Sequence, residues 1–158
     1  MEMELFFTNF SYPLNNKFNM ILDIQFSDKS KTNIIRFSDF DFQFDSILKR
    51  ILFKVTIQFD FFNANLNMEW EEADFLYLKD GVEKIYCSSI TKLIFKPMID
   101  QRIYFEFTLM NNESVMIDAN VFNDTYTGTL KFIFETNLGQ MQIVNEQIAN
   151  ILMNTPRD

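Results

Sequence analysis

The feature that most constrains this chain is an alternation of apolar and polar residues with a period of two. The clearest stretch spans residues 51–61, where Ile, Phe and Val occupy every second position. The same alternation occurs in residues 18–26, 103–109, 115–121 and 130–134. A strand places successive side chains on opposite faces, so such stretches are typical of half-buried strands. The pattern predicts a meander of antiparallel strands.

Two irregularities interrupt this alternation. Ile35 and Phe37 occupy one parity, whereas Phe40, Phe42 and Phe44 occupy the other. The change indicates either two strands or one strand with a bulge near residues 38–39. The asparagine-rich residues 63–67 are expected to end the strand that begins at residue 51.

Two segments show helical spacing instead. Apolar residues recur at intervals of three and four between residues 71 and 88, which predicts a helix there. Glycine destabilises the interior of a helix, so Gly81 argues against this prediction. Asp80 and Gly81 could instead form the turn of a hairpin joining residues 75–78 to 82–86. The helix is the favoured alternative. A second helix is expected over residues 138–153, with Asn137 as its N-cap.

These elements predict an α+β fold, a mainly antiparallel sheet of meander or sandwich-like form with two packed helices at about 71–88 and 138–153. We expect a single domain over residues 1–158. Each half places strands before a helix, which suggests an internal duplication, but no matching motif supports it.

The composition excludes several chemistries. The 158 residues include no histidine, one cysteine (Cys87) and three glycines that lie far apart. His-based catalysis, histidine or thiolate metal sites and glycine-rich phosphate loops are therefore ruled out. We expect no enzyme activity and no cofactor, and we expect Cys87 to be a buried, unreactive thiol.

The net charge of the chain limits the kinds of partner that it can bind. The formal net charge is −8 and the sequence pI is about 4.5, whereas a nucleic-acid binder needs a basic footprint. Residues 1–7 carry acids where a signal peptide carries Lys or Arg, and no apolar run reaches membrane-spanning length. The sequence therefore predicts a cytoplasmic protein that binds neither nucleic acid nor membrane.

The densest acidic cluster surrounds the single tryptophan. It comprises Glu69, Trp70, Glu71, Glu72 and Asp74. These acids could complement the dipole at a helix start, or they could flank a tryptophan hot spot for a basic protein partner. A carboxylate pair of a glycosidase is a third, weaker alternative.

Three further carboxylates, Asp39, Asp41 and Asp45, alternate with phenylalanines and are predicted to share one strand face. Their pattern lacks the glycine and distal Glu of a calcium loop, so we expect a solvated face and not a metal site. This second cluster is the next candidate for partner binding.

Most of the twenty phenylalanines follow the apolar parity of their strands. Phe7, Phe62 and Phe122 occupy the opposite parity. They are candidates for a second packed layer or for an interface.

From residue 36 onward the chain resembles a known family. The residues concerned are LIFKPM at 93–98, IYFEF at 103–107, GTLKFIF at 128–134 and the amphipathic helix at 138–152. This layout is similar to that of the WapI-like immunity proteins of bacterial polymorphic-toxin systems, although Lys96 stands where the family usually has an acidic residue. The resemblance implies a non-catalytic protein that binds and neutralises a toxin domain.

The expected function is therefore that of a cytoplasmic immunity protein whose acidic and aromatic surface takes a protein partner, with a basic toxin domain as the candidate. The alternative is a small adaptor or a self-associating structural domain, which includes a homo-oligomer.

Overall fold

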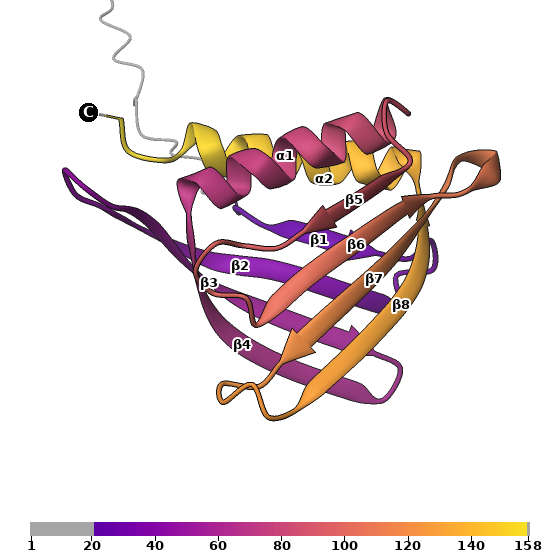
Figure 1. Ribbon diagram of the computed structural model, residues 1–158, viewed down its shortest axis with the longest axis horizontal. Coiled ribbons are helices and arrows are strands. Elements are labelled where there is room, and N and C mark those ends of the chain that lie inside the picture. The colour runs from indigo at the N-terminus through magenta and orange to yellow at the C-terminus, as the bar shows by residue number, and fades with distance from the viewer. Residues whose placement is uncertain (1–20, 158) are drawn as a thin grey trace, which may run out of the picture.

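The computed structural model describes residues 21–157 and contains two four-stranded antiparallel sheets and two helices (Figure 1). The first sheet has the order β1-β2-β3-β4 and the second the order β5-β6-β7-β8. The elements are β1 (Ile24–Ser27), β2 (Asn33–Phe44), β3 (Lys49–Phe59), β4 (Phe62–Glu71), α1 (Glu72–Tyr86), β5 (Lys92–Phe95), β6 (Ile103–Leu109), a 3-10 turn η1 (Asn111–Glu113), β7 (Ser114–Phe122), β8 (Thr129–Asn137) and α2 (Leu138–Met153). The predicted α+β, strand-rich fold with two helices is confirmed.

The described residues form two halves with the same element order, four strands followed by a helix. Every strand in a sheet is hydrogen-bonded to its neighbour in sequence, so each sheet is a simple meander. The element order that suggested a duplication in the sequence is therefore repeated in the two halves of the structure.

The inner faces of the two sheets pack against each other through aromatic rings. The ring centroids of Phe26 and Phe105 lie 5.0 Å apart, those of Trp70 and Phe95 5.1 Å apart, and those of Phe59 and Phe132 4.4 Å apart. One continuous hydrophobic cluster joins both sheets and both helices. This shared core explains the alternation in the sequence, because alternate residues of the strands face it.

The helices lie side by side across one end of the two sheets (Figure 1). Helix α1 buries Phe75, Leu78, Val82 and Ile85, and α2 buries Met141, Val144, Ile148 and Ile151. The helical alternative for residues 71–88 is thus confirmed and the hairpin is excluded.

Gly81 has a packing role in this helix. A Cβ added there would approach the Cδ2 atom of Leu93 to 2.6 Å, so the missing side chain lets α1 lie directly on β5. The glycine that weakened the helical prediction is what allows the helix to pack at this point.

The two irregularities in the alternation have different outcomes. The parity change is a bulge within the single strand β2, between Ser38 and Asp41, with Asp39 at a φ of 56°. The expected break at residues 63–67 is wrong, because this segment lies inside β4. The chain turns instead at Asp60, whose φ is 43°, and Phe61.

The asparagines of β4 caused this error. Asn63, Asn65 and Asn67 are exposed, and they alternate with residues that are partly or fully buried, ending at Met68 and Trp70. Asparagine is rare in strands, so its abundance hid a regular period of two. The predicted strand over residues 18–26 is described only from residue 21, and β1 begins at Ile24; its earlier part lies outside the described residues.

Candidate functional site

The outer face of the first sheet brings two separate acidic clusters together. In the strand register Asp41 of β2 pairs with Leu52 of β3, and Leu52 pairs with Glu69 of β4. The three side chains therefore form one row across the solvent-facing side. Two strand spacings separate Asp41 from Glu69, about 10 Å.

The adjacent row moderates this negative charge. It contains Gln43, Arg50 and Glu71 in register. The Nη1 atom of Arg50 lies 3.3 Å from the Oε1 atom of Glu69, and both side chains remain well exposed to solvent. An exposed pair of this kind contributes little to stability, so both groups remain available to a charged partner.

A hollow of about 450 Å³ opens beside Glu69 at the edge of the first sheet. Its lining residues are Leu52, Asn67, Met68, Glu69, Ile99, Asp100, Arg102, Asp124 and Tyr126. The carboxylates of Glu69 and Asp124 lie among the apolar side chains of Leu52 and Ile99 and the ring of Tyr126. The hollow therefore offers both carboxylate oxygens and an aromatic surface.

Asp100 and Arg102 form the structural floor of this hollow. The Nε atom of Arg102 donates to Asp100 Oδ1 at 2.8 Å, and Nη2 donates to Oδ2 at 2.6 Å. Burial by itself raises the pKa of Asp100, but the hydrogen bonds and charge of Arg102 outweigh it and hold the pKa below its ordinary value. The same pairing raises the pKa of Arg102 further above its already high value. Both groups stay charged, and Arg102 also pairs with Asp124.

This ion pair also closes part of the edge of β4. Asp100 Oδ2 accepts the backbone N–H of Glu69 at 3.2 Å, and Arg102 donates to the backbone carbonyl of Asn67. The carbonyl of Asp100 accepts the indole N–H of Trp70 at 3.2 Å. The segment of residues 100–102 thus takes the place of a neighbouring strand and joins the two halves.

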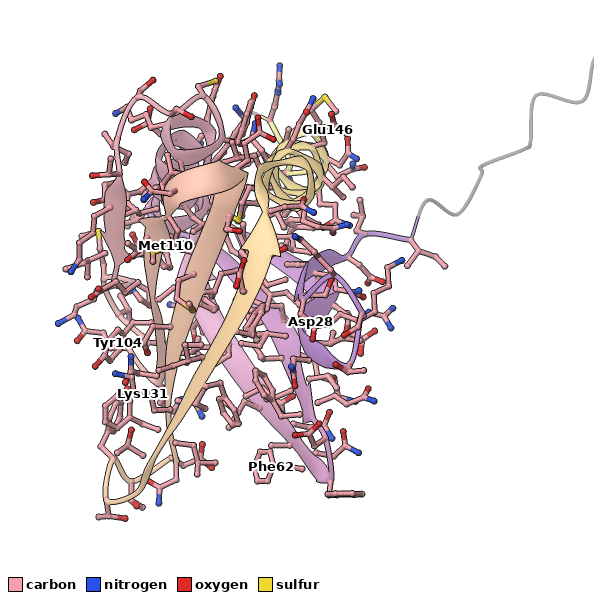
Figure 2. The ribbon with its side chains drawn as sticks, turned by 90° about the vertical axis from the view of Figure 1, so that its right-hand side faces the viewer. Asp28, Phe62, Tyr104, Met110, Lys131 and Glu146 are labelled. Carbon is pink, nitrogen blue, oxygen red and sulfur yellow. The ribbon has the colours of Figure 1, made fainter. Side chains whose placement is uncertain are left out.

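An aromatic row continues from the hollow over the outer face of the second sheet. The ring of Tyr126 lies 5.8 Å from that of Phe122, which lies 6.0 Å from that of Tyr104. The Nζ atom of Lys96 sits 5.0 Å from the centroid of Tyr104. Figure 2 shows Tyr104 and Lys131 on the side of this sheet that faces away from the first sheet. We call the surface formed by Asp41, Leu52, Glu69, Asp124, Tyr126, Phe122 and Tyr104 the acidic–aromatic surface.

The residues of the acidic cluster predicted around the tryptophan have different positions and different roles in the structure. Trp70 is fully buried in the core, so the prediction that it belongs to a binding surface is wrong. Asp74 is also buried; its Oδ2 accepts the Glu71 N–H at 3.0 Å and its Oδ1 accepts the Met98 N–H at 2.9 Å. Glu71 completes a capping box with Asp74, and Glu72 lies in the first helical turn, 3.4 Å from the Nζ atom of Lys49. Only Glu69 reaches the acidic–aromatic surface.

The second predicted cluster is also divided. Asp39 and Asp41 are exposed, and Asp39 sits in the bulge. Asp45 lies beyond the strand, where its carboxylate accepts the N–H groups of Leu48 at 2.7 Å and Ile47 at 2.8 Å. These two bonds lower the pKa of Asp45. The prediction that all three acids share one strand face is wrong for Asp45, which organises the β2–β3 turn instead.

Four other residues were singled out in the sequence. Phe122 belongs to the aromatic row, and Phe62 is partly exposed with its ring 5.6 Å from that of Phe132. Phe7 lies outside the described residues. Cys87 is exposed at the end of α1, so the expectation of a buried thiol is wrong.

Sequence reasoning missed Asp100, Arg102, Asp124 and Tyr126. They belong to two loops, and no periodic pattern marks a loop residue as part of a surface. The closeness of Asp100 to Arg102 in sequence was the only available signal. Within residues 21–157 no group of three acidic or cysteine side chains is arranged to hold a metal ion.

The comparisons add little to this picture. No protein-family model matches the chain, and no curated protein sequence does. Among solved structures, the chain is similar to the crystal structure of MRP1/MRP2 from Trypanosoma brucei, with 6% sequence identity, a TM-score of 0.45 and coverage of 84% of this chain and 83% of that one. Neither helix in the described part of the chain is long and apolar enough to span a membrane.

Proposed function

We propose that this protein is a non-catalytic binding protein that takes a basic protein partner on its acidic–aromatic surface. The observation that carries the proposal is the convergence of Asp41 and Glu69 on one face, next to a hollow that adds Asp124 and Tyr126. Carboxylates beside an exposed aromatic ring suit a guanidinium group, which pairs with the oxygens and stacks on the ring.

The biological role that we propose is immunity, in which the protein neutralises a toxin domain in the cytoplasm. The resemblance to the WapI-like immunity proteins and the net charge of −8 support this role. A toxin domain that acts on nucleic acid is expected to be basic, and an acidic inhibitor would steer toward it and compete with its substrate.

The test is capture of partners from the native host lysate by three forms of the full chain. The wild type is compared with the double variant Asp41→Lys/Glu69→Lys, and with Glu83→Lys/Glu146→Lys as a control of equal charge change on the helices. We expect the wild type and the control to retain a basic domain of a larger protein that elutes with salt. The surface variant should retain at least about tenfold less of it, since each reversal replaces attraction with repulsion.

Thermal unfolding of all three forms checks that the substitutions leave the fold intact. Co-expression of the captured domain then tests immunity, because only the wild type and the control should protect the cell. Equal retention of the domain by all three forms would overturn the acidic–aromatic surface as the binding site. A captured domain that does not harm the cell would overturn the immunity role alone.

The edge strand β8 favours a second candidate function, self-association. Leu130 and Ile133 are 46% and 55% exposed on this strand. Antiparallel pairing with a second copy, centred on Ile133, would place Lys131 opposite Glu135 of that copy. A mass that rises with concentration, and that Ile133→Lys keeps monomeric, would support this function in place of the inhibitor.

A further inference from the structure

The edge strand β5 of the second sheet turns backbone hydrogen-bonding groups outward. It is bonded to β6 on one side only, and in Figure 1 it lies beside α1. The Leu109 N–H donates to the Thr91 carbonyl at 2.8 Å, so in this antiparallel ladder Leu93, two residues on, also turns its backbone groups toward β6. Lys92 and Ile94 have the other parity, and their N–H and C=O groups therefore point away from the sheet.

Both edges of the first sheet are closed by side chains, whereas the β5 edge is open. On β1 the outward N–H of Gln25 donates to Oε1 of Gln147 at 2.9 Å. On β4 the outward N–H of Glu69 donates to Asp100. Within residues 21–157 no group bonds the outward N–H or C=O of Ile94. An unpaired edge of this kind is a template for a further strand.

A hollow of about 430 Å³ lies at this edge, between β5 and α1. Its lining residues are Ala73, Asp74, Tyr77, Ile94, Lys96 and Met98. Tyr77, Ile94 and Met98 are 53%, 49% and 70% exposed, so large apolar side chains face the open edge. An extended peptide that joins a sheet gains affinity from backbone hydrogen bonds and specificity from such hollows, which take its alternate side chains.

The walls of this hollow are held in place by contacts between α1 and the segment of residues 93–98. Oδ1 of Asp74 accepts the Met98 N–H at 2.9 Å. The ring of Tyr77 stacks on that of Phe95, with 6.0 Å between their centroids. The hollow is therefore formed before any segment binds, which reduces the entropic cost of binding.

The charged groups around the hollow already have contacts within the chain. Both oxygens of the buried Asp74 accept backbone N–H groups. The Nζ atom of Lys92 lies 2.7 Å from Oε1 of Glu106, and the Nζ atom of Lys96 lies 5.0 Å from the ring centroid of Tyr104. Backbone pairing and apolar contact therefore select what binds here, and charge contributes little.

We propose that β5 accepts an extended segment of a protein partner as an additional strand. Apolar side chains at alternate positions of that segment cover Tyr77 and Met98, and its backbone bonds the outward groups of Ile94. A second copy of this chain is a poorer occupant, because antiparallel pairing of two β5 strands centred on Ile94 sets Lys92 opposite Lys96. The site is separate from the acidic–aromatic surface and does not require that surface to bind.

Selection of random twelve-residue peptides, displayed on phage, against the full chain tests the proposal. The strongest binders are synthesised, and calorimetry measures their affinity for the wild type. Methylation of the peptide's backbone nitrogens should weaken binding about tenfold at alternate positions and much less at the positions between them, because only every second N–H of an added strand faces β5. Hydrogen exchange at the Ile94 amide should slow when the peptide binds, whereas exchange at Leu93, which is bonded to β6, should not change.

Two matched pairs of variants locate the contact. Ile94→Pro and Ile94→Ala both remove the isoleucine side chain, but only proline also removes the outward N–H, and proline is tolerated where an edge N–H faces solvent. Ile94→Pro should therefore bind the peptides roughly fivefold to tenfold more weakly than Ile94→Ala. Tyr77→Ala should weaken binding, whereas Leu76→Ala, at an equally exposed neighbour that lines a different hollow, should not.

Failure to select any peptide, equal affinity of Ile94→Pro and Ile94→Ala, or methylation effects without alternation would overturn the proposal. Binding that is lost in Asp41→Lys/Glu69→Lys and kept in Ile94→Pro would place the peptides on the acidic–aromatic surface and would also overturn it. A mass that rises with concentration in the wild type but not in Ile94→Pro would show that β5 pairs with a second copy instead. Thermal unfolding checks each variant, and the methylation series needs only the wild type.

Discussion

The outer faces of the two sheets differ in kind, although the two halves of the chain share one element order. On the first sheet the solvent side carries asparagines and charged groups, such as Asn65, Lys54 and Glu69. The second sheet also carries charged groups, in the ion pairs Lys92–Glu106 and Lys131–Asp118, but it adds the aromatic row and the exposed Ile133. The inner faces are alike, because both supply large apolar side chains to the same core. The comparison shows that the inward pattern determines the architecture, while the outward residues are free to form different surfaces.

The free edges of the two sheets differ in the same way. Along β4, the Asp100–Arg102 pair and Asp74 satisfy outward-facing backbone groups from residue 67 to residue 71. Along β8, exposed Leu130 and Ile133 border the edge. Protected edges resist further strand pairing, so the first sheet is the one whose edge is closed by its own chain.

The largest expected effect concerns the shared core. Phe105→Ala should lower the free energy of unfolding by about 3–5 kcal/mol, because it removes a buried ring that contacts Phe26 across the two sheets. The adjacent outward residue provides the control, since Tyr104→Ala should cost about 1 kcal/mol or less. Urea unfolding of both variants measures the difference. Similar losses for the two would contradict the distinction between inner and outer faces.

The next effect concerns the closure of the β4 edge. Asp100→Ala should destabilise the protein by roughly 3 kcal/mol, because it leaves the Glu69 N–H without a partner and removes the carboxylate that pairs with Arg102 in a half-buried site. Asp124→Ala removes the other partner of Arg102, but this carboxylate is 81% exposed and its loss should cost little. Hydrogen exchange at the Glu69 amide, compared between the variants, locates the effect. An unchanged exchange rate in Asp100→Ala would show that the ion pair does not close the edge.

A smaller loss of stability is expected from substitutions at the N-termini of the two helices, and its size should differ between them. Asp74→Ala should cost roughly 2 kcal/mol, since this buried carboxylate accepts both the Glu71 and the Met98 N–H groups. Asn137→Ala should cost about 1 kcal/mol, because its side chain accepts only the Gln140 N–H at 2.8 Å. Thermal unfolding of the two variants tests the order. A larger loss for Asn137→Ala would reverse this part of the comparison.

The smallest predicted effect is a difference in pH response between two turns, the β1–β2 turn that contains Asp28 and the β7–β8 turn. Burial by itself raises the pKa of Asp28, but hydrogen bonds from Thr32, Asn33 and Ser30 outweigh it and lower the pKa below 3.8. A lowered folded-state pKa contributes stability above the ordinary value, and this contribution is lost as the pH falls through the folded pKa. In the β7–β8 turn the neutral side chain of Asn123 accepts the equivalent bonds from Thr127 and Gly128.

Amide exchange should therefore accelerate selectively at Thr32 between pH 4 and pH 2, after correction for the intrinsic rate. Exchange at Thr127 should follow the intrinsic rate over the same range. Asp28→Asn should remove the selective change at Thr32. Parallel behaviour of the two turns would contradict the assignment of the pH response to Asp28.

The comparison also indicates how far the sequence predicted the structure. The helix of residues 71–88 was predicted although Gly81 argued against it, because four buried residues kept a helical spacing. Strand β4 was missed because Asn63, Asn65 and Asn67 resemble a loop in composition, even though they alternate with inward-facing residues. Trp70 was misplaced for a related reason: its acidic neighbours suggested a surface, while its parity places it in the core.

The sequence by itself determined the strands other than β4, both helices and the α+β class, because burial on alternate residues or on one helical stripe is a local property of the chain. The tertiary structure alone decided which outward residues meet. Asp41 reaches Glu69 through the register of three strands, Arg102 reaches Asn67 across the two halves, and Leu76 of α1 and Met153 of α2 line the same hollow. These contacts join residues that are distant in sequence, and their geometry is set by the packing of the whole core, which no local pattern encodes.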